Sequence, residues 1–347
     1  MQDDPFIGMT LSQRYRVLQQ ERVEGPARFY RAHDLETHQD VAIKLLPPHQ
    51  ADDRATVARF AREMLATATL AHPNAVTMLD FGEDRLYDFI VLEYLSNSRT
   101  LAEVLEAGEP MPIQRVAHIA AQVASALAAA HAEGIVHRNL CTDTILLMPG
   151  DGGWDLVKIR DFGLARLTGD EDPDVTAIGT VLGTPETTAP EYILEGRIDP
   201  RGDLYALGVL IWWMLMGHAP FTGKRIHVLQ MQTESVPPRP SELRKDVPDW
   251  LDELTWALLA KQPEARPRNA RDLIPILEEG VGHSLGPPQK MATRDFEAFS
   301  EAQSQREEKR AQTTRIMWLV LAAAIVLLAL LAGLLFAAGV SLTVLSQ

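Results

Sequence analysis

The sequence predicts an α+β protein with two lobes, followed by a membrane-spanning helix near the C-terminus. Segments with strand character lie almost entirely before residue 100, and segments with helical periodicity dominate after it. Strands and helices in separate stretches of chain are typical of α+β proteins. Residues 316–340 form an apolar run without a charged side chain, which predicts the membrane helix.

The composition narrows the function classes. The 347 residues carry a formal net charge of −14, which argues against a basic nucleic-acid-binding surface. The 46% content of hydrophobic residues excludes disorder over the whole chain. Cys141 is the single cysteine, so neither a disulfide framework nor a cysteine zinc site is expected, and a reducing compartment is favoured. Residues 1–10 are acidic and lack a long apolar core, so no signal peptide is expected.

The first hundred residues read as short strands around one helix. Five strands are predicted, at residues 15–18, 28–33, 40–45, 76–82 and 87–92. A helix is predicted over residues 55–70 and is expected to stop near Pro73. Its apolar stripe consists of Val57, Phe60, Ala61, Met64, Leu65 and Ala68.

Helices dominate from residue 100 onward. Residues 113–133 repeat apolar side chains at helical spacing, and Gly134 stands where a helix-terminating glycine is expected. Residues 281–315 contain a Gly and Pro stretch and then a charged segment of helical character. We interpret them as a polar juxtamembrane linker, a solvated spacer.

The apolar run is long enough to cross a bilayer. A helix over residues 316–340 spans roughly 37 Å at 1.5 Å per residue. Basic residues precede it and the short tail 341–347 carries no charged side chain, so residues 1–315 are predicted to lie in the cytoplasm. A buried globular helix is the alternative. Gly333 and Ala337 are a small-residue pair that would allow two such helices to pack closely, which leaves a homodimer open.

Six short motifs follow one another along the chain. They are Val-Ala-Ile-Lys at 41–44, Ile-Val-His-Arg-Asn-Leu at 135–140, Lys-Ile-Arg-Asp-Phe-Gly at 158–163, Thr-Ala-Pro-Glu at 188–191, Arg-Gly-Asp-Leu-Tyr-Ala-Leu-Gly at 201–208 and Lys-Gln-Pro-Glu-Ala-Arg-Pro at 261–267. In this order and at these intervals they resemble the bacterial eukaryotic-like (Hanks-type) Ser/Thr protein kinases, over about residues 14–280.

The resemblance implies a bilobal protein-kinase-like fold. The N-lobe, about residues 14–95, would be an antiparallel sheet plus one helix that closes over ATP, and the C-lobe, about residues 96–280, would be mostly helical. With the C-terminal transmembrane helix, the resemblance also implies a single-pass protein of the bacterial inner (cytoplasmic) membrane, with the kinase-like domain on the cytoplasmic side.

Part of the phosphotransfer machinery implied by the resemblance is present. Lys44 matches the lysine that contacts the α and β phosphates of ATP, and Glu63 on the predicted N-lobe helix matches its ion-pair partner. Asp161 matches the carboxylate that holds Mg²⁺, a hard cation that takes oxygen ligands.

The catalytic loop departs from the family pattern at three positions. Asn139 stands where the proton-accepting aspartate is expected, and loss of a positioned base typically costs about 10²- to 10⁴-fold in rate. Cys141 replaces the lysine that approaches the γ-phosphate. Thr144 replaces the asparagine that ligates a second metal, and the neighbouring Asp143 occupies a position that normally faces away from the phosphates.

The phosphate-covering loop is altered as well. Counting back from Phe29, the three glycines of the family pattern fall at Arg22, Glu24 and Ala27, and only Gly25 remains, off register. Glycines serve there because the backbone approaches the phosphates closely. Arg22 could grip a phosphate, whereas Glu24 would repel one.

Residues that serve the fold are retained in the pattern. His137 and Phe162 resemble the packed column that joins the lobes, and Asp203 resembles the aspartate that anchors the catalytic loop. Glu191 and Arg266 resemble the ion pair that fastens the activation segment.

A regulatory site is also implied by the resemblance. Arg138 matches the receptor for a phosphate on the activation loop, and Thr176 lies near the position that carries it. An unmodified loop threonine is the alternative.

Two functions remain open at this point. The favoured one is a membrane-tethered pseudokinase, a scaffold or allosteric partner of other proteins, with at most weak binding of ATP and Mg²⁺. The alternative is a slow Ser/Thr kinase that transfers the ATP γ-phosphate to protein hydroxyls, because phosphoryl transfer depends chiefly on positioning and electrostatics.

Overall fold

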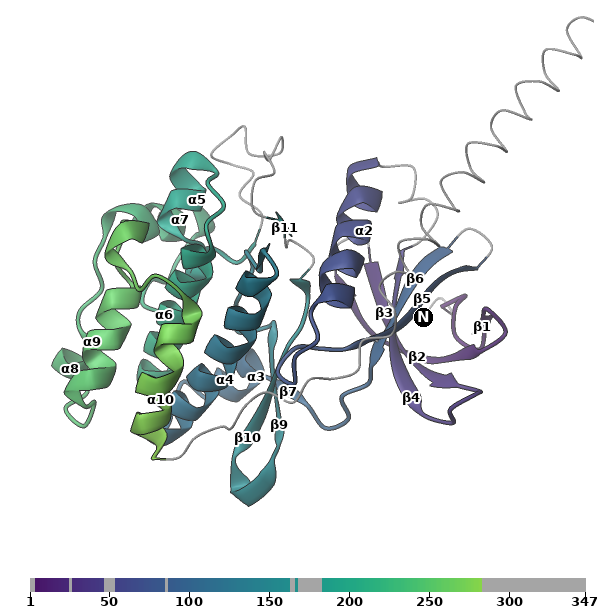
Figure 1. The fold of residues 1–347 in the computed structure, drawn as a ribbon, viewed down its shortest axis with the longest axis horizontal. Helices are drawn as coiled ribbons and strands as arrows, with labels where there is room; N and C mark the ends of the chain where they lie inside the picture. Colours follow the sequence, from purple (N-terminus) through teal and green to yellow (C-terminus); the bar gives the residue numbers. More distant parts are fainter. Residues whose placement is uncertain are drawn as a thin grey trace, which may run out of the picture. The chain divides into compact units, whose positions relative to one another are not determined.

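The computed structural model describes residues 4–24, 27–46, 54–84, 87–162, 166–167 and 183–282. They form a sheet-based lobe and a helical lobe (Figure 1). The chain divides into two units, residues 1–292 and 293–347, and the run at 316–340 lies outside the described residues. Within the described part of the chain, no helix combines the length and apolar character needed to cross a membrane.

The N-lobe is a six-stranded antiparallel sheet with the strand order β1-β2-β3-β4-β6-β5. Its strands are β1 (Thr10–Leu11), β2 (Tyr15–Glu24), β3 (Ala27–Asp34), β4 (Asp40–Leu46), β5 (Met78–Asp84) and β6 (Tyr87–Glu93). The five predicted strands are confirmed, β1 is added, and β2 continues to Glu24. Alternate side chains such as Tyr30 and Ala32, or Val41 and Ile43, enter one apolar cluster, as the period of a strand requires.

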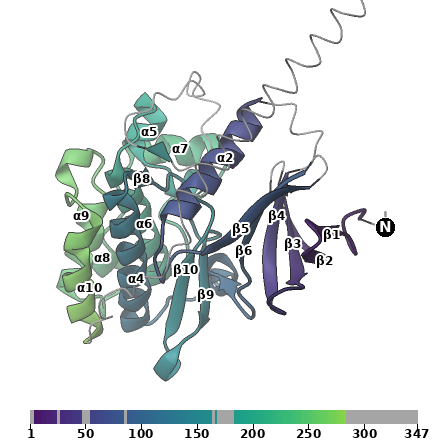
Figure 2. The ribbon, with the colours of Figure 1, turned by 45° about the vertical axis from the view of Figure 1, so that its right-hand side comes forward.

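Helix α2 (Arg54–Thr69) lies between the sheet and the helical lobe (Figures 1 and 2). Its buried side chains include Phe60, Glu63 and Ala66. The predicted stripe is confirmed in part: Phe60 is buried and Met64 packs against the same cluster, whereas Leu65 is half-buried outside it. The charged Glu63, outside the predicted stripe, is buried because it pairs with Lys44 of β4.

The segment between α2 and β5 is tied to the helical lobe by a buried hydrogen-bond cluster. The Asn74 side-chain amide donates to Gln122 Oε1 and to the Val157 carbonyl oxygen, each at 2.9 Å. The Asn74 backbone N–H donates to His72 Nδ1 at 3.1 Å, and His72 Nε2 lies 3.1 Å from Ser125 Oγ. These bonds join the segment that follows α2 to the helical lobe.

The same cluster makes the stability of the fold depend on pH. Burial, together with the charge of Lys158, lowers the pKa of His72 to about 4, and an unfolded histidine has a pKa of about 6.5. Below pH 6.5, His72 is therefore protonated in the unfolded chain while it stays neutral in the folded chain until the pH approaches 4. We expect stability to fall as the pH drops from about 7 towards 4, by up to roughly 3 kcal/mol from this residue.

The measurement is the free energy of unfolding against pH for the native chain and for His72→Gln. The variant is expected to give a flatter profile between pH 7 and 4. His227→Gln is the matched control, because His227 is exposed. Parallel profiles for the native chain and His72→Gln would contradict the assignment.

The C-lobe is built on helices α4 (Ile113–Ala132) and α6 (Pro200–Met216), which contribute more side chains to its core than any other elements. The predicted helix is confirmed, and Gly134 has a φ of +74°, which terminates it. Gly208 of α6 faces helix α9 (Asp249–Leu258), where a Cβ atom would lie 2.6 Å from Leu258 Cβ, so the glycine permits that contact.

The remaining C-lobe elements surround these two helices. The helices are α3 (Leu101–Leu105), α5 (Pro190–Glu195), α7 (Arg225–Glu234), α8 (Pro240–Leu243), α9 (Asp249–Leu258) and α10 (Leu273–Val281), with 3-10 turns at Asp151–Gly153, Pro185–Thr187, Pro263–Ala265 and Ala270–Asp272. Two small antiparallel sheets join β7 (Arg99–Thr100), β9 (Ile145–Pro149) and β10 (Asp155–Ile159), and β8 (Ile135–Val136) with β11 (Arg166–Leu167).

Candidate functional site

A cleft of about 510 Å³ lies between the two lobes. Its volume falls within the range of small-molecule sites. Strands β2, β3 and β4 contribute one side, and the segment after β6, helix α3 and the loops around β9 and β10 contribute the other. Its lining includes Arg22, Phe29, Ala42, Leu92, Glu93, Tyr94, Leu95, Asp143, Leu146, Arg160 and Asp161.

Lys44 and Glu63 form an ion pair between β4 and α2. Their side chains are 8% and 9% exposed, so the pair is almost fully desolvated. The Lys44 ammonium also lies 5.0 Å from the centre of the Phe29 ring. The pair expected from the sequence is therefore assembled beside the cleft.

Two arginines hold the carboxylate of Asp161. Arg22 on β2 approaches both carboxylate oxygens, at 3.3 and 3.4 Å, and Arg160 Nε lies 3.1 Å from Oδ2. Asp161 is 7% exposed and has a φ of +62°, a backbone conformation that aspartate tolerates better than most residues. Arg22 was predicted near the phosphates, but its pairing with Asp161 was not. Arg160 was missed, although it stands directly before Asp161 in the motif at 158–163.

Asn139 connects the catalytic loop to the segment before α5. Its side-chain oxygen accepts a hydrogen bond from the Thr184 backbone N–H at 3.1 Å, and the Thr184 hydroxyl lies 3.4 Å away. Because the backbone N–H requires an acceptor, the amide oxygen must face Thr184. The position expected for the catalytic base is thus occupied by an amide whose oxygen accepts a hydrogen bond from Thr184. An amide is not a basic group.

The Thr144 side chain forms hydrogen bonds with the backbone of Cys141 within the same loop. The Thr144 hydroxyl accepts from the Cys141 backbone N–H and donates to the Cys141 carbonyl oxygen, both at 3.0 Å. Thr144 is 3% exposed. Burial raises the pKa of the Cys141 thiol, which keeps it neutral where a lysine is expected by resemblance.

These residues fit a nucleotide better than they fit its magnesium ion. Asp161 is bound by guanidinium groups, and the Thr144 hydroxyl is used inside the loop. Mg²⁺ needs near-octahedral oxygen coordination and gives up its water reluctantly. In the part of the chain that the structure describes, no group of three or more His, Cys, Asp or Glu side chains could hold a metal ion.

Asp143 lies in the lining of the cleft, with an exposed side chain. Its orientation relative to bound phosphates stays a prediction. Its carboxylate adds a further negative charge to the lining of the cleft, which also contains Asp161.

The positions of the family glycines lie on the β2–β3 hairpin. Arg22 pairs with Phe29 across the two strands, and Glu24 pairs with Ala27. Ala27 is buried, and Gly25 lies outside the described residues. The hairpin thus places an arginine, rather than a glycine backbone, over the cleft.

The residues predicted to serve the fold are brought together. Asp203 accepts hydrogen bonds from the backbone N–H groups of His137 and Arg138, each at 2.9 Å, and from His131 Nε2 at 2.8 Å. Burial acts to raise the pKa of Asp203, but the bond and charge of His131 outweigh it and hold the pKa below the usual value. The His137 and Phe162 rings lie 4.5 Å apart. His131 was not predicted from the sequence.

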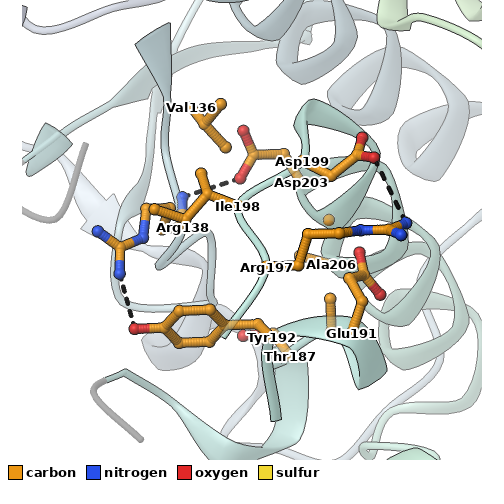
Figure 3. Close-up of a pocket in the computed structure, with 12 residues that line it drawn as sticks. Val136, Arg138, Thr187, Glu191, Tyr192, Arg197, Ile198, Asp199, Asp203 and Ala206 are labelled. Atoms are coloured by element: carbon orange, nitrogen blue, oxygen red, sulfur yellow. Dashed lines mark hydrogen bonds and ion pairs between the residues drawn. The ribbon is translucent and has the colours of Figure 1, made fainter. Parts of the chain in front are cut away.

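Arg138, the predicted phosphate receptor, lies beside a small cavity of about 30 Å³ (Figure 3). Its guanidinium donates to the Tyr192 hydroxyl at 2.7 Å and lies 5.0 Å from the centre of that ring. Thr176, its predicted phosphorylated partner, lies outside the described residues. Tyr192 was missed, although it directly follows Glu191 in the sequence.

Glu191 and Arg266 form a bidentate ion pair, with distances of 2.7 and 2.8 Å. Their side chains are 4% and 0% exposed. Arg266 also donates to the carbonyl oxygens of Ala260, Arg201 and Lys261. This pair fastens the start of α5 to the end of the C-lobe.

Comparison with known proteins agrees with this fold. The family model for the protein kinase domain matches residues 25–274. The serine/threonine-protein kinase pkn3 of Myxococcus xanthus is 35% identical over 274 residues, which cover 77% of this chain and 50% of that protein. The serine/threonine-protein kinase PknL of Mycobacterium tuberculosis is 34% identical over 281 residues, which cover 80% of this chain and 69% of that protein.

A solved structure shows the same fold. The kinase domain of Mycobacterium tuberculosis PknI superposes with a TM-score of 0.60 at 24% identity, covering 79% of this chain and 98% of that one. The chain spans only half of the length of pkn3. On the match over residues 25–274, the chain belongs to the protein kinase domain family, and the relatives named here are bacterial serine/threonine protein kinases.

Proposed function

We propose that the chain is a membrane-tethered pseudokinase that acts on other proteins as a scaffold or allosteric partner. The observation that carries the proposal is the hydrogen bonding of the Asn139 side chain at the position expected for the catalytic base. Its amide oxygen binds the Thr184 backbone N–H, and an amide cannot accept the proton of a substrate hydroxyl.

Three further observations support a loss of phosphotransfer. Cys141 supplies no cation at the γ-phosphate position, and the Thr144 hydroxyl is bonded within its own loop. Asp161 is bound by Arg22 and Arg160. Together with Asn139, these residues affect the base, the metal and the developing charge, which are separate contributions to the same rate.

A slow Ser/Thr kinase is the second candidate, and two observations favour it. The Lys44–Glu63 pair is assembled, and the scaffold bonds of Asp203 are intact. A kinase without its base retains positioning and electrostatic stabilisation, so residual transfer from ATP to a protein hydroxyl is chemically reasonable.

Mass spectrometry separates the two candidates. The full chain, purified in detergent, is incubated with ATP and Mg²⁺ or Mn²⁺, with and without an added protein substrate. The pseudokinase predicts no phosphate on Thr176, on other residues or on the added protein. Phosphate that forms with the native chain and is lost in Asp161→Ala would show that the chain is an active kinase.

Tethering to the membrane is part of the same proposal and rests on residues 316–340. We expect the full chain, expressed in bacteria, to stay in the membrane fraction during alkaline carbonate extraction, because roughly 25 apolar residues suffice to span a bilayer. A chain ending at residue 315 is expected in the supernatant. Extraction of the full chain by carbonate would contradict the tether.

Orientation is tested with fusions at the C-terminus. The basic residues before the run predict that residues 341–347 lie on the periplasmic side. A C-terminal alkaline phosphatase fusion should therefore be active, and a C-terminal green fluorescent protein fusion should be dark. The reverse pattern would contradict the predicted orientation.

A further inference from the structure

Arg22 lies where the cleft meets the carboxylate of Asp161. It stands on β2 next to an irregularity in the β2–β3 pairing, between Gln20 and Arg22. Its guanidinium carbon lies 3.5 Å from the centre of the Phe29 ring, and its terminal nitrogen approaches both oxygens of Asp161. Stacking on an aromatic face fixes a guanidinium group in orientation as well as in position.

Arg160 reaches the same carboxylate from the C-lobe. Its Nε atom lies 3.1 Å from Asp161 Oδ2, and its side chain is 16% exposed. Two guanidinium groups thus contact one carboxylate, one from each lobe. Both arginines and Asp161 line the cleft of about 510 Å³.

We propose that Arg22, with Arg160, takes the place of a divalent cation at Asp161, so that the cleft binds the phosphates of a nucleoside polyphosphate without metal. This inference rests on the proposed function, a pseudokinase that does not transfer phosphate, and adds a ligand for its cleft. The ligand class is a nucleoside diphosphate or triphosphate, recognised at its phosphate end by guanidinium groups.

Charge explains why the cleft needs these arginines. A bare carboxylate repels a phosphate, and in a metal-dependent site the cation between them removes the repulsion. Here the carboxylate of Asp161 is already paired, and Asp143 adds a further negative charge to the lining. Guanidinium groups form bidentate, charge-assisted hydrogen bonds with phosphate oxygens, so they can neutralise and orient the ligand together.

A metal ion would have to compete for the same atoms. It would displace Arg22 from Asp161, and it would find the Thr144 hydroxyl already bonded to the Cys141 backbone. A bound magnesium ion would therefore gain few protein ligands here, while it would break the contact between Arg22 and Asp161.

The test is a titration of the full chain in detergent with a fluorescent ATP analogue, in excess EDTA and in millimolar Mg²⁺. We expect the dissociation constants in the two conditions to agree within about three-fold, whereas a metal-dependent site would differ by more than about ten-fold. Arg22→Ala is expected to weaken binding in EDTA by at least about ten-fold, because it removes a charged contact to phosphate.

Two further variants sharpen the result. Arg16→Ala is the matched control, since Arg16 lies on the same strand, is exposed and does not line the cleft; its binding should equal that of the native chain. Asp161→Asn should bind in EDTA at least as tightly as the native chain, because it removes a negative charge near the phosphates. Thermal melts of every variant verify folding.

Three outcomes would overturn the inference. The first is that the native chain binds the analogue only in Mg²⁺, and the second is that it binds the analogue in neither condition. The third is that Arg22→Ala binds more tightly in EDTA, which would mean that Arg22 obstructs the cleft. Each is distinct from a failure of the proposed function, which is read from transferred phosphate by mass spectrometry rather than from binding.

Discussion

Replacing Arg266 with alanine is expected to lower the free energy of unfolding by about 3–5 kcal/mol. Arg266 is 0% exposed and forms a bidentate pair with Glu191, which is itself 4% exposed. The substitution leaves the Glu191 carboxylate buried and unpaired, and it removes the donor to three backbone carbonyl oxygens. Burying a charge without a partner is among the costliest changes in a protein interior.

Thermal unfolding of the full chain in detergent measures this effect. For a domain of this size, each kcal/mol of lost stability lowers the midpoint temperature of unfolding by about 2–4 °C, so this temperature should fall by at least about 6 °C. Arg197→Ala is the matched control, because Arg197 and its partner Glu264 are 40% and 62% exposed, and an exposed pair contributes less than about 1 kcal/mol. Equal shifts for the two variants would show that the Arg266 pair does not fasten the C-lobe.

Asn139→Asp is expected to give phosphate transfer to protein at about 10²-fold the background incorporation measured with the native chain. That factor is the lower end of the range for a positioned base. The substitution changes the amide to a carboxylate of nearly the same shape. One oxygen can still accept from Thr184 at the observed 3.1 Å, while the other becomes a proton acceptor. The lower end is chosen because Cys141 and Thr144 remain altered in the variant.

The comparison is made with radiolabelled ATP and Mg²⁺, with phosphorylated residues identified afterwards. Asn139→Ala is the matched variant, since it removes the acceptor for Thr184 and supplies no base; it should transfer no more phosphate than the native chain. An unchanged rate in Asn139→Asp would mean that the base is not what limits the native chain, and would shift the explanation to the metal site.

The fold could be predicted largely from the sequence because its signals are local. Period-two alternation located five strands of the N-lobe sheet, and helical periodicity with a terminating glycine located α4. Helix α2 was placed correctly, and its buried face was predicted in part, since Phe60 and Met64 pack against the sheet. A hydrophobic pattern cannot anticipate a buried Glu63, whose inward orientation depends on Lys44 in a different element.

The site could be predicted only in part, because its decisive contacts join residues far apart in the chain. The motifs located Asp161 and Asn139, but they did not reveal that Arg22 would reach Asp161, or that Thr184 would bond to Asn139. The first contact depends on the irregular β2–β3 pairing and on stacking against Phe29.

Other contacts could not be predicted because they depend on side chains that no motif identifies. The Arg138 guanidinium donates a hydrogen bond to Tyr192, and its role as a phosphate receptor stays a prediction. Asp143 lies in the lining of the cleft, which the sequence pattern alone did not indicate.

The most direct test of the pseudokinase proposal is the ratio of two initial rates. Phosphate incorporation into Ser and Thr is measured for the native full chain and for Asp161→Ala, under identical conditions with saturating ATP and Mg²⁺. Because Asn139 offers no base and Asp161 is held by arginines, the predicted ratio is one. A reproducible excess of phosphate on the native chain would contradict the proposal and establish a working kinase.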